Sequence, residues 1–172
     1  MSAIGATGLQ LYNFGQTISM VFFTDTWRPS SYYDRIKENA QCGLHTLVLL
    51  DIKVKEQSLA NMARGRKVYE PPRFMTVAKC AQQMLQTEGE REEGFCRPQS
   101  LAVGVARLGA VDQQMLAGTL EQLSHADLGA PLHSLVLLGK RTHYLEKDYI
   151  RAFAVDGAVL DKVWSEDYEL KR

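Results

Sequence analysis

Short apolar runs alternate with segments that carry helix signals along most of this chain, and this pattern sets the fold class more strongly than any other feature. Four runs predict strands, at 17–23, at 44–52, from 101 into 106–109, and at 132–138. Helix signals lie between and after them, at 31–41, 76–86, 114–124 and 143–154. Strands that alternate with helices are typical of layered domains. The sequence therefore predicts an α/β fold.

Length and charge limit the class of protein. The chain has 172 residues, about the size of one domain, and its 20 basic side chains balance 20 acidic ones. A balanced surface does not attract nucleic acid or an anionic membrane through its overall field. No apolar run is long enough to span a bilayer, and the first residues lack the regions of a signal peptide. Three widely spaced cysteines suit reduced thiols. We expect a soluble cytoplasmic protein with no direct contact to nucleic acid or membrane.

The strand that begins at residue 101 ends in an unusual way. It runs into Ala106-Arg107-Leu108-Gly109, and a second group of small residues, Ala117-Gly118-Thr119, follows a polar turn. A strand that serves only the core needs neither an arginine nor a glycine at its end. Glycine lets another group approach the backbone closely. The pattern therefore predicts that something lies against this strand end.

Motifs for metal binding and catalysis are missing from the sequence. Cys42 and His45 form a C-x-x-H pair without a second half, so we expect no metal and interpret His45 as a strand-entry residue. There is no G-x-S-x-G elbow, no Walker lysine loop and no G-x-G-x-x-G, so we expect no catalytic nucleophile. His133 opens a buried strand, where its ring needs a partner in the protein or in a ligand. The residues alone favour the partner within the protein.

Three further features leave two interpretations open. Asp51 ends a strand at the edge where α/β sheets place ligands, but it is equally consistent with a solvated aspartate. The segment 53–73 holds six basic and two acidic residues, a net charge of +4, and is either a solvated loop or a docking surface for a large acidic partner. Trp27 is a surface anchor or a tryptophan that caps the core, and the second interpretation is favoured.

Longer stretches of sequence carry a resemblance that single motifs do not. The stretches 8–75, 103–123 and 127–140 resemble the diphthine synthases of eukaryotes, and the resemblance extends from residue 1 to about residue 154. This family belongs to the tetrapyrrole-methylase-like class of S-adenosylmethionine (SAM) dependent methyltransferases. The resemblance implies a fold of two α/β domains with the cofactor in the cleft between them.

The sequence matches only part of that family pattern, because the N-terminal cofactor domain is absent from it. The resemblance implies that 1–13 is the remnant of an inter-domain helix and that 156–172 is a charged tail. It implies that 14–155 is the C-terminal α/β methyltransferase domain, with a mixed sheet flanked by helices. An isolated chain of this kind is expected to bind SAM weakly and to be inactive.

Three cofactor contacts carry over by position from the family. Leu50 precedes the aspartate of "LLDIK", Leu108 lies between the arginine and glycine of "ARLG", and His133 is the histidine of "PLHSL". The resemblance implies that these positions contact the adenosine part of SAM, largely through their backbone. It implies no catalytic side chain and no metal.

The resemblance also implies a substrate and partners. The family methylates the modified histidine of translation elongation factor 2, repeatedly on the amino group and, in eukaryotes, also on the carboxylate, and it forms homodimers. The alternative is a non-catalytic fragment that dimerises or docks on the elongation factor. A methylase of small tetrapyrroles is a third hypothesis, which the long segment 53–73 disfavours, since a small substrate needs no such extension.

Overall fold

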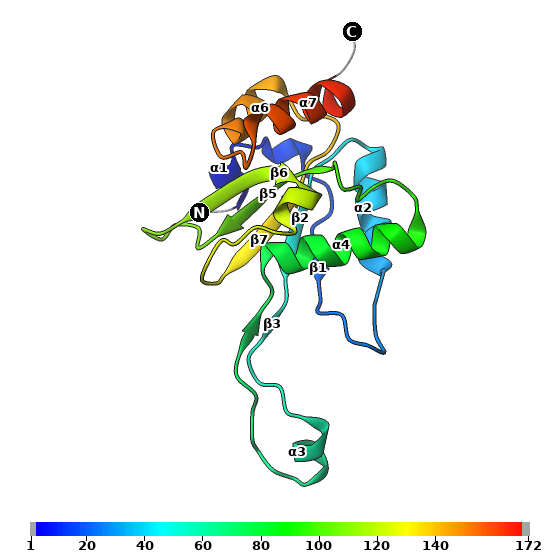
Figure 1. The fold of residues 1–172 in the computed structure, drawn as a ribbon, viewed down its shortest axis with the longest axis vertical. Helices are drawn as coiled ribbons and strands as arrows, with labels where there is room; N and C mark the ends of the chain where they lie inside the picture. The colour runs from blue at the N-terminus through cyan, green and yellow to red at the C-terminus, as the bar shows by residue number, and fades with distance from the viewer. Residues whose placement is uncertain (1–2, 170–172) are drawn as a thin grey trace.

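A five-stranded mixed sheet forms the centre of the protein (Figure 1). The computed structural model describes residues 3–169. In the spatial order β1-β2-β7-β5-β6, the strands are Ile18–Met20, Thr46–Leu50, His133–Leu137, Leu101–Ala106 and Gln114–Thr119. β1 and β2 are parallel, and the remaining neighbours are antiparallel. The predicted mixed sheet is therefore confirmed.

Helices cover both faces of this sheet. One face packs against α2, α4 and α5, which are Ser31–Gln41, Val77–Arg91 and Leu120–Leu123. The other face packs against α1, α6 and α7, which are Ala3–Thr7, Tyr144–Arg151 and Gly157–Val163. Each face holds its own apolar core. β5 lies between the two cores and is buried along its whole length, as its unbroken apolar sequence predicts.

The predicted helix at 114–124 is wrong over its first half. Residues 114–119 form strand β6, which pairs with β5 in the register Ala102–Gly118 and Ala106–Gln114. The chain reverses direction between the two strands, where Arg107 (φ 51°) and Gly109 (φ 84°) take left-handed conformations. Thr119 then caps α5, so the helix begins there and not at residue 114. Hairpin pairing with β5 overrides the weak helical signal of the intervening residues.

Two of the other predicted helices occur where the sequence places them. The helix predicted at 31–41 is α2, and the helix predicted at 76–86 is α4, which continues to Arg91. The extension follows from Glu88, which points inward. Its carboxylate accepts hydrogen bonds from the Tyr33 hydroxyl and from the backbone N–H groups of Gly94 and Cys96, 2.6 Å each. A residue that looks polar in the sequence thus anchors the following loop.

The predicted helix at 143–154 is shorter, and the chain after it stays against the sheet. The helix ends at Arg151, and α7 follows after a short turn. A π-helical turn, Trp164–Tyr168, comes directly after α7, and both of its aromatic end residues are buried. The Tyr168 hydroxyl accepts a hydrogen bond of 2.9 Å from the backbone N–H of Leu101. The described part of the expected charged tail therefore packs into the second core.

One segment leaves the body of the protein altogether. The short strands β3 (Ile52–Lys53) and β4 (Arg73–Phe74) pair with each other, and the chain between them extends far from the sheet to the small helix α3 (Leu59–Ala63) (Figure 1). No helix among residues 3–169 is long and apolar enough to cross a membrane.

Candidate functional site

The three residues predicted to contact a cofactor lie at one end of the sheet. Leu50 is the last residue of β2, His133 is the first residue of β7, and Leu108 follows the end of β5 by two residues. β2 and β5 both run antiparallel to β7 and flank it. The carboxyl ends of the two outer strands therefore lie beside the amino end of the central one. The register of the sheet brings these positions together although 83 residues separate the first from the last.

His133 is held entirely by the protein. It is 8% exposed, and its Nδ1 accepts a hydrogen bond of 3.3 Å from the backbone N–H of Val77, the first residue of α4. Its Nε2 lies 3.1 Å and 3.0 Å from the carbonyl oxygens of Gly129 and Ala130, so we place the ring proton on this nitrogen. Both ring nitrogens are thus engaged, as the residues alone favoured. The ring therefore positions the loop before β7.

Leu108, unlike His133, has polar groups that the described part of the chain leaves unpaired. Its side chain packs against the second core, but neither its backbone N–H nor its carbonyl oxygen has a hydrogen-bond partner within residues 3–169. Gly109 follows it, and a Cβ built there would meet no atom within 4 Å. The φ of 84° favours glycine at this position. Crowding does not, since the space around it is open. The strand end therefore presents unpaired backbone groups to an open region.

The contacts of Arg107 explain why an arginine follows this strand. Its guanidinium donates hydrogen bonds to the carbonyl oxygens of Leu128 (2.7 Å) and Ala130. It also donates to the carbonyl oxygen of Asp112, and it forms an ion pair of 2.7 Å with that residue's carboxylate. Because His133 binds Ala130 as well, arginine and histidine together fix the loop before β7 against the loop after β5.

Asp51 has a structural role at the same edge. Its carboxylate accepts a hydrogen bond of 3.3 Å from the backbone N–H of Phe22 and lies 3.5 Å from the ammonium group of Lys53. Its carbonyl oxygen accepts a hydrogen bond from the N–H of Met75. These contacts join β1, β3 and the chain that follows β4.

Trp27 lies in the loop after β1 and is 55% exposed, so the favoured prediction that it caps the core is wrong.

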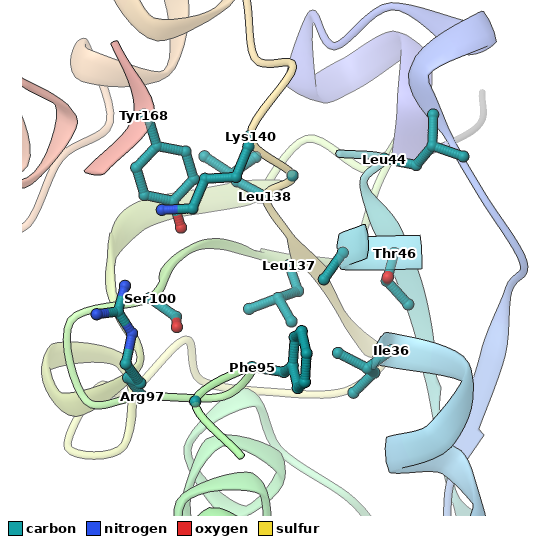
Figure 2. Close-up of a pocket in the computed structure, with 13 residues that line it drawn as sticks. Ile36, Leu44, Thr46, Phe95, Arg97, Ser100, Leu137, Leu138, Lys140 and Tyr168 are labelled. Carbon is teal, nitrogen blue, oxygen red and sulfur yellow. The ribbon is translucent and has the colours of Figure 1, made fainter. Parts of the chain in front are cut away.

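A cavity of about 150 Å³ lies at the opposite end of the sheet (Figure 2). Its apolar wall includes Ile36, Phe95 and Leu137, and Arg97 and Lys140 stand at its side. Both cations are bound to Asp167, the first through its carboxylate and the second through its carbonyl oxygen. This cavity does not include the predicted cofactor contacts. A shallower hollow of about 380 Å³ borders the start of β6 and includes Leu128, the partner of Arg107.

Sequence reasoning missed one buried pair of titratable groups. His45 and Glu146 are both almost fully buried, with 3.5 Å between Nε2 and the nearer carboxylate oxygen. The carboxylate also accepts hydrogen bonds from the backbone N–H groups of Gln10 and His143. His45 is a strand-entry residue, as expected, but no sequence signal points to its partner 101 positions away.

The described residues contain no group of three histidine, cysteine or acidic residues placed to hold a metal. Cys80 and Cys96 are buried free thiols, and burial raises the pKa of each well above the ordinary value. Thiols in this environment are poor nucleophiles at neutral pH. Cys42 is an exposed free thiol, so the three cysteines are all unpaired.

The fold and the grouped strand ends define a mixed-sheet α/β domain with unpaired backbone groups of Leu108 at one sheet end. Comparison with known proteins identifies relatives of this domain. No protein-family model matches the chain. Over 164 residues, or 95% of its length, it is 74% identical to the diphthine methyl ester synthase of Emericella nidulans. It is 56% identical to the corresponding Saccharomyces cerevisiae protein over 98% of its length. The chain is thus homologous to the diphthine methyl ester synthases along nearly all of its residues.

Solved structures agree with this relationship. A crystal structure of an Entamoeba histolytica protein assigned to the diphthine synthases covers 90% of the chain with a TM-score of 0.79 and 43% identity. A second diphthine synthase structure covers 93% of the chain with a TM-score of 0.69 and 26% identity. The chain spans 58% of the Emericella nidulans relative and 56% of the Entamoeba histolytica structure. It therefore corresponds to a little over half of such a protein.

Proposed function

We propose that this chain is part of a SAM-dependent methyltransferase of diphthamide biosynthesis. Its substrate is the modified histidine of translation elongation factor 2, methylated repeatedly on the amino group and also on the carboxylate. The single observation that carries the proposal is the meeting of Leu50, Leu108 and His133 at one sheet end, in a chain 74% identical to a diphthine methyl ester synthase. The proposal includes a homodimer in the cytoplasm.

The residues at this sheet end fit an adenosine group. The unpaired N–H and carbonyl of Leu108 supply one donor and one acceptor, the pair that the edge of an adenine ring needs. Leu50 and His133 lie on the neighbouring strands at the same sheet end, and His133 fixes the adjoining loop. Arg107 keeps the loop geometry, because it fastens the turn that carries Leu108 to the loop before β7. The fit rests on backbone groups, which agrees with the contacts that the family resemblance implies.

The proposed reaction needs no catalytic side chain from this chain. SAM supplies a methyl group on a positively charged sulfur, and an amine or carboxylate of the substrate attacks it in line. An amine needs only to lose its proton, and a carboxylate is already nucleophilic. Holding the reacting groups in line contributes up to about 7–11 kcal/mol to the lowering of the barrier. The chain's own contribution is therefore orientation and exclusion of water at the sheet end.

A non-catalytic fragment that only dimerises or docks is the weaker hypothesis. It would not require an open region with unpaired backbone groups at the end of β5, and the relatives that the chain matches are named as synthases.

The test replaces Leu108 by proline, which removes the N–H and leaves a small apolar side chain. The same change is made at the aligned position of the Emericella nidulans relative. SAM affinity is measured by calorimetry, and transfer of labelled methyl to elongation factor 2 is measured separately. We expect the relative to lose at least about tenfold in SAM affinity, the equivalent of one lost hydrogen bond of roughly 1.4 kcal/mol. Thermal unfolding serves as the control for folding. Unchanged affinity in a folded variant would remove the adenosine site from this strand end.

A further inference from the structure

The segment 54–72, which we name the basic arm, carries charges that the protein itself does not neutralise. At its base several charges are paired: Glu56 accepts a hydrogen bond from Arg73 and lies 3.5 Å from Lys53, which also pairs with Asp51. Lys55 at the base, and Arg64, Arg66 and Lys67 farther out, form no ion pair with any residue in 3–169 and are all exposed. The structure offers them no compensating partner.

Apolar side chains accompany these cations. Met62, Val68 and Tyr69 are between 53% and 58% exposed, and none of them belongs to either core of the domain. The nearby helix α3 still has a defined start, since the Ser58 hydroxyl accepts a hydrogen bond from the N–H of Asn61. The arm therefore presents apolar and cationic groups together, in and around the short helix α3. Exposed apolar groups gathered in this way mark interaction surfaces.

The position of the basic arm ties it to the sheet end described above. It follows β3, which begins directly after Leu50 and Asp51, and it returns through β4 to Met75. Two residues later, the N–H of Val77 binds the ring of His133. Paired strands β3 and β4, and the Arg73 guanidinium over the ring of Phe22 at 5.3 Å, hold this root in place. The root of the arm therefore lies beside the strand ends, and the arm extends outward from there.

We propose that the basic arm docks an acidic surface of the protein that receives the methyl group. This inference rests on the proposed function, because it assigns a recognition surface to its macromolecular substrate. A modified side chain on a large protein is presented together with the protein surface around it. A long arm rooted beside the site can contact the substrate protein at a distance from the reacting atoms and raise the rate of encounter through its charge.

The composition of the arm favours a protein over a nucleic acid as the partner. A nucleic-acid interface gains most of its affinity from many phosphate contacts, and it is much more positive than a protein interface. Here four unpaired cations are interspersed with three exposed apolar residues, and the whole chain has no net charge. Mixed apolar and cationic groups suit an acidic protein surface with an apolar centre.

The experiment compares two double charge reversals of equal size. The test variant is Arg64→Glu with Arg66→Glu, and the control is Arg35→Glu with Lys162→Glu, whose side chains are exposed and form no ion pair within residues 3–169. Binding to elongation factor 2 is measured at 50 mM and 500 mM salt, together with SAM affinity and unfolding temperature. We expect the test variant to weaken protein binding roughly tenfold at low salt and less at high salt, with SAM affinity unchanged.

Each alternative result has a defined meaning. Equal weakening in the control variant would show a general effect of charge and would overturn the role of the arm. Unchanged binding in the test variant would overturn it as well, as would an affinity for an RNA oligonucleotide that only the test variant loses. Weak SAM binding by this chain alone is expected, whereas failure of the unaltered Emericella nidulans relative to bind SAM would contradict the proposed function, so the two failures are distinguishable.

Discussion

Arg107 shows how a single side chain can hold two loops in register. It adopts a positive φ of 51°, and its guanidinium joins the turn after β5 to the loop before β7. We expect Arg107→Ala to lower the free energy of unfolding by about 1–3 kcal/mol, because a charged group loses its hydrogen bonds to the carbonyl oxygens of Leu128, Ala130 and Asp112. Arg107→Gly loses the same bonds but tolerates the backbone conformation, so we expect it to be about 1 kcal/mol more stable than the alanine variant. Urea unfolding at pH 7 measures both, and equal stability of the two variants would contradict the backbone argument.

The buried pair His45 and Glu146 makes stability depend on pH. Burial lowers the pKa of His45, and the nearby carboxylate of Glu146 only partly opposes this effect. Between the unfolded pKa of about 6.5 and the lower folded value, the unfolded chain binds the extra proton, so stability falls as the pH falls through this window. We expect a loss of up to about 1.4 kcal/mol per pH unit below pH 6.5. In His45→Asn this part of the slope is expected to disappear, and urea unfolding from pH 7.5 to 5 checks it. An identical slope in the variant would assign the effect to another group.

At the scale of the element, the π-helical turn after α7 closes the second core. Burial raises the pKa of Tyr168 to about 12, and its hydroxyl is the partner of the Leu101 N–H at the start of β5. We expect Tyr168→Phe to cost about 1–3 kcal/mol of unfolding free energy, because the N–H of a central strand is left without a partner. As a comparison, Tyr144→Phe changes a tyrosine that is 59% exposed and should have little effect. A negligible cost at position 168 would show that this hydrogen bond does not stabilise the start of β5.

At the scale of the whole molecule, the body and the basic arm are expected to be separable. β3 and β4 pair through Ile52–Phe74 and Lys53–Arg73, so an Asn-Gly turn in place of 54–72 closes a two-residue hairpin. The arm contributes nothing to either core, so we expect the unfolding free energy to change by less than about 1 kcal/mol, as loop length has a small effect. The near-ultraviolet circular dichroism should also be unchanged. A large loss of stability would show that the arm supports the fold.

Local patterns in the sequence predict much of this structure. The apolar run at 44–52, the capping threonine before α4 and the unbroken apolar strand at 101–106 act through neighbouring residues, and each occurs close to the predicted position. β6 does not follow its local signal, because its pairing with β5 and the hydrogen bonds of Ala117 with Phe153 and Val155 outweigh the weak helical propensity of residues 114–119. The identity of the three positions at the sheet end came from resemblance to a family and not from any local pattern.

Long-range geometry accounts for the rest. Leu50, Leu108 and His133 form one site because β2 and β5 both flank β7 in antiparallel register, and strand order is not written in any local pattern. The same holds for His45 and Glu146, whose proximity depends on the packing of α6. The charge of 53–73 was visible in the sequence, but its lack of partners and its root beside the site were not. Local chemistry specifies which elements can form, whereas contacts between residues distant in the chain specify which groups meet, because their energies exist only after the chain has folded.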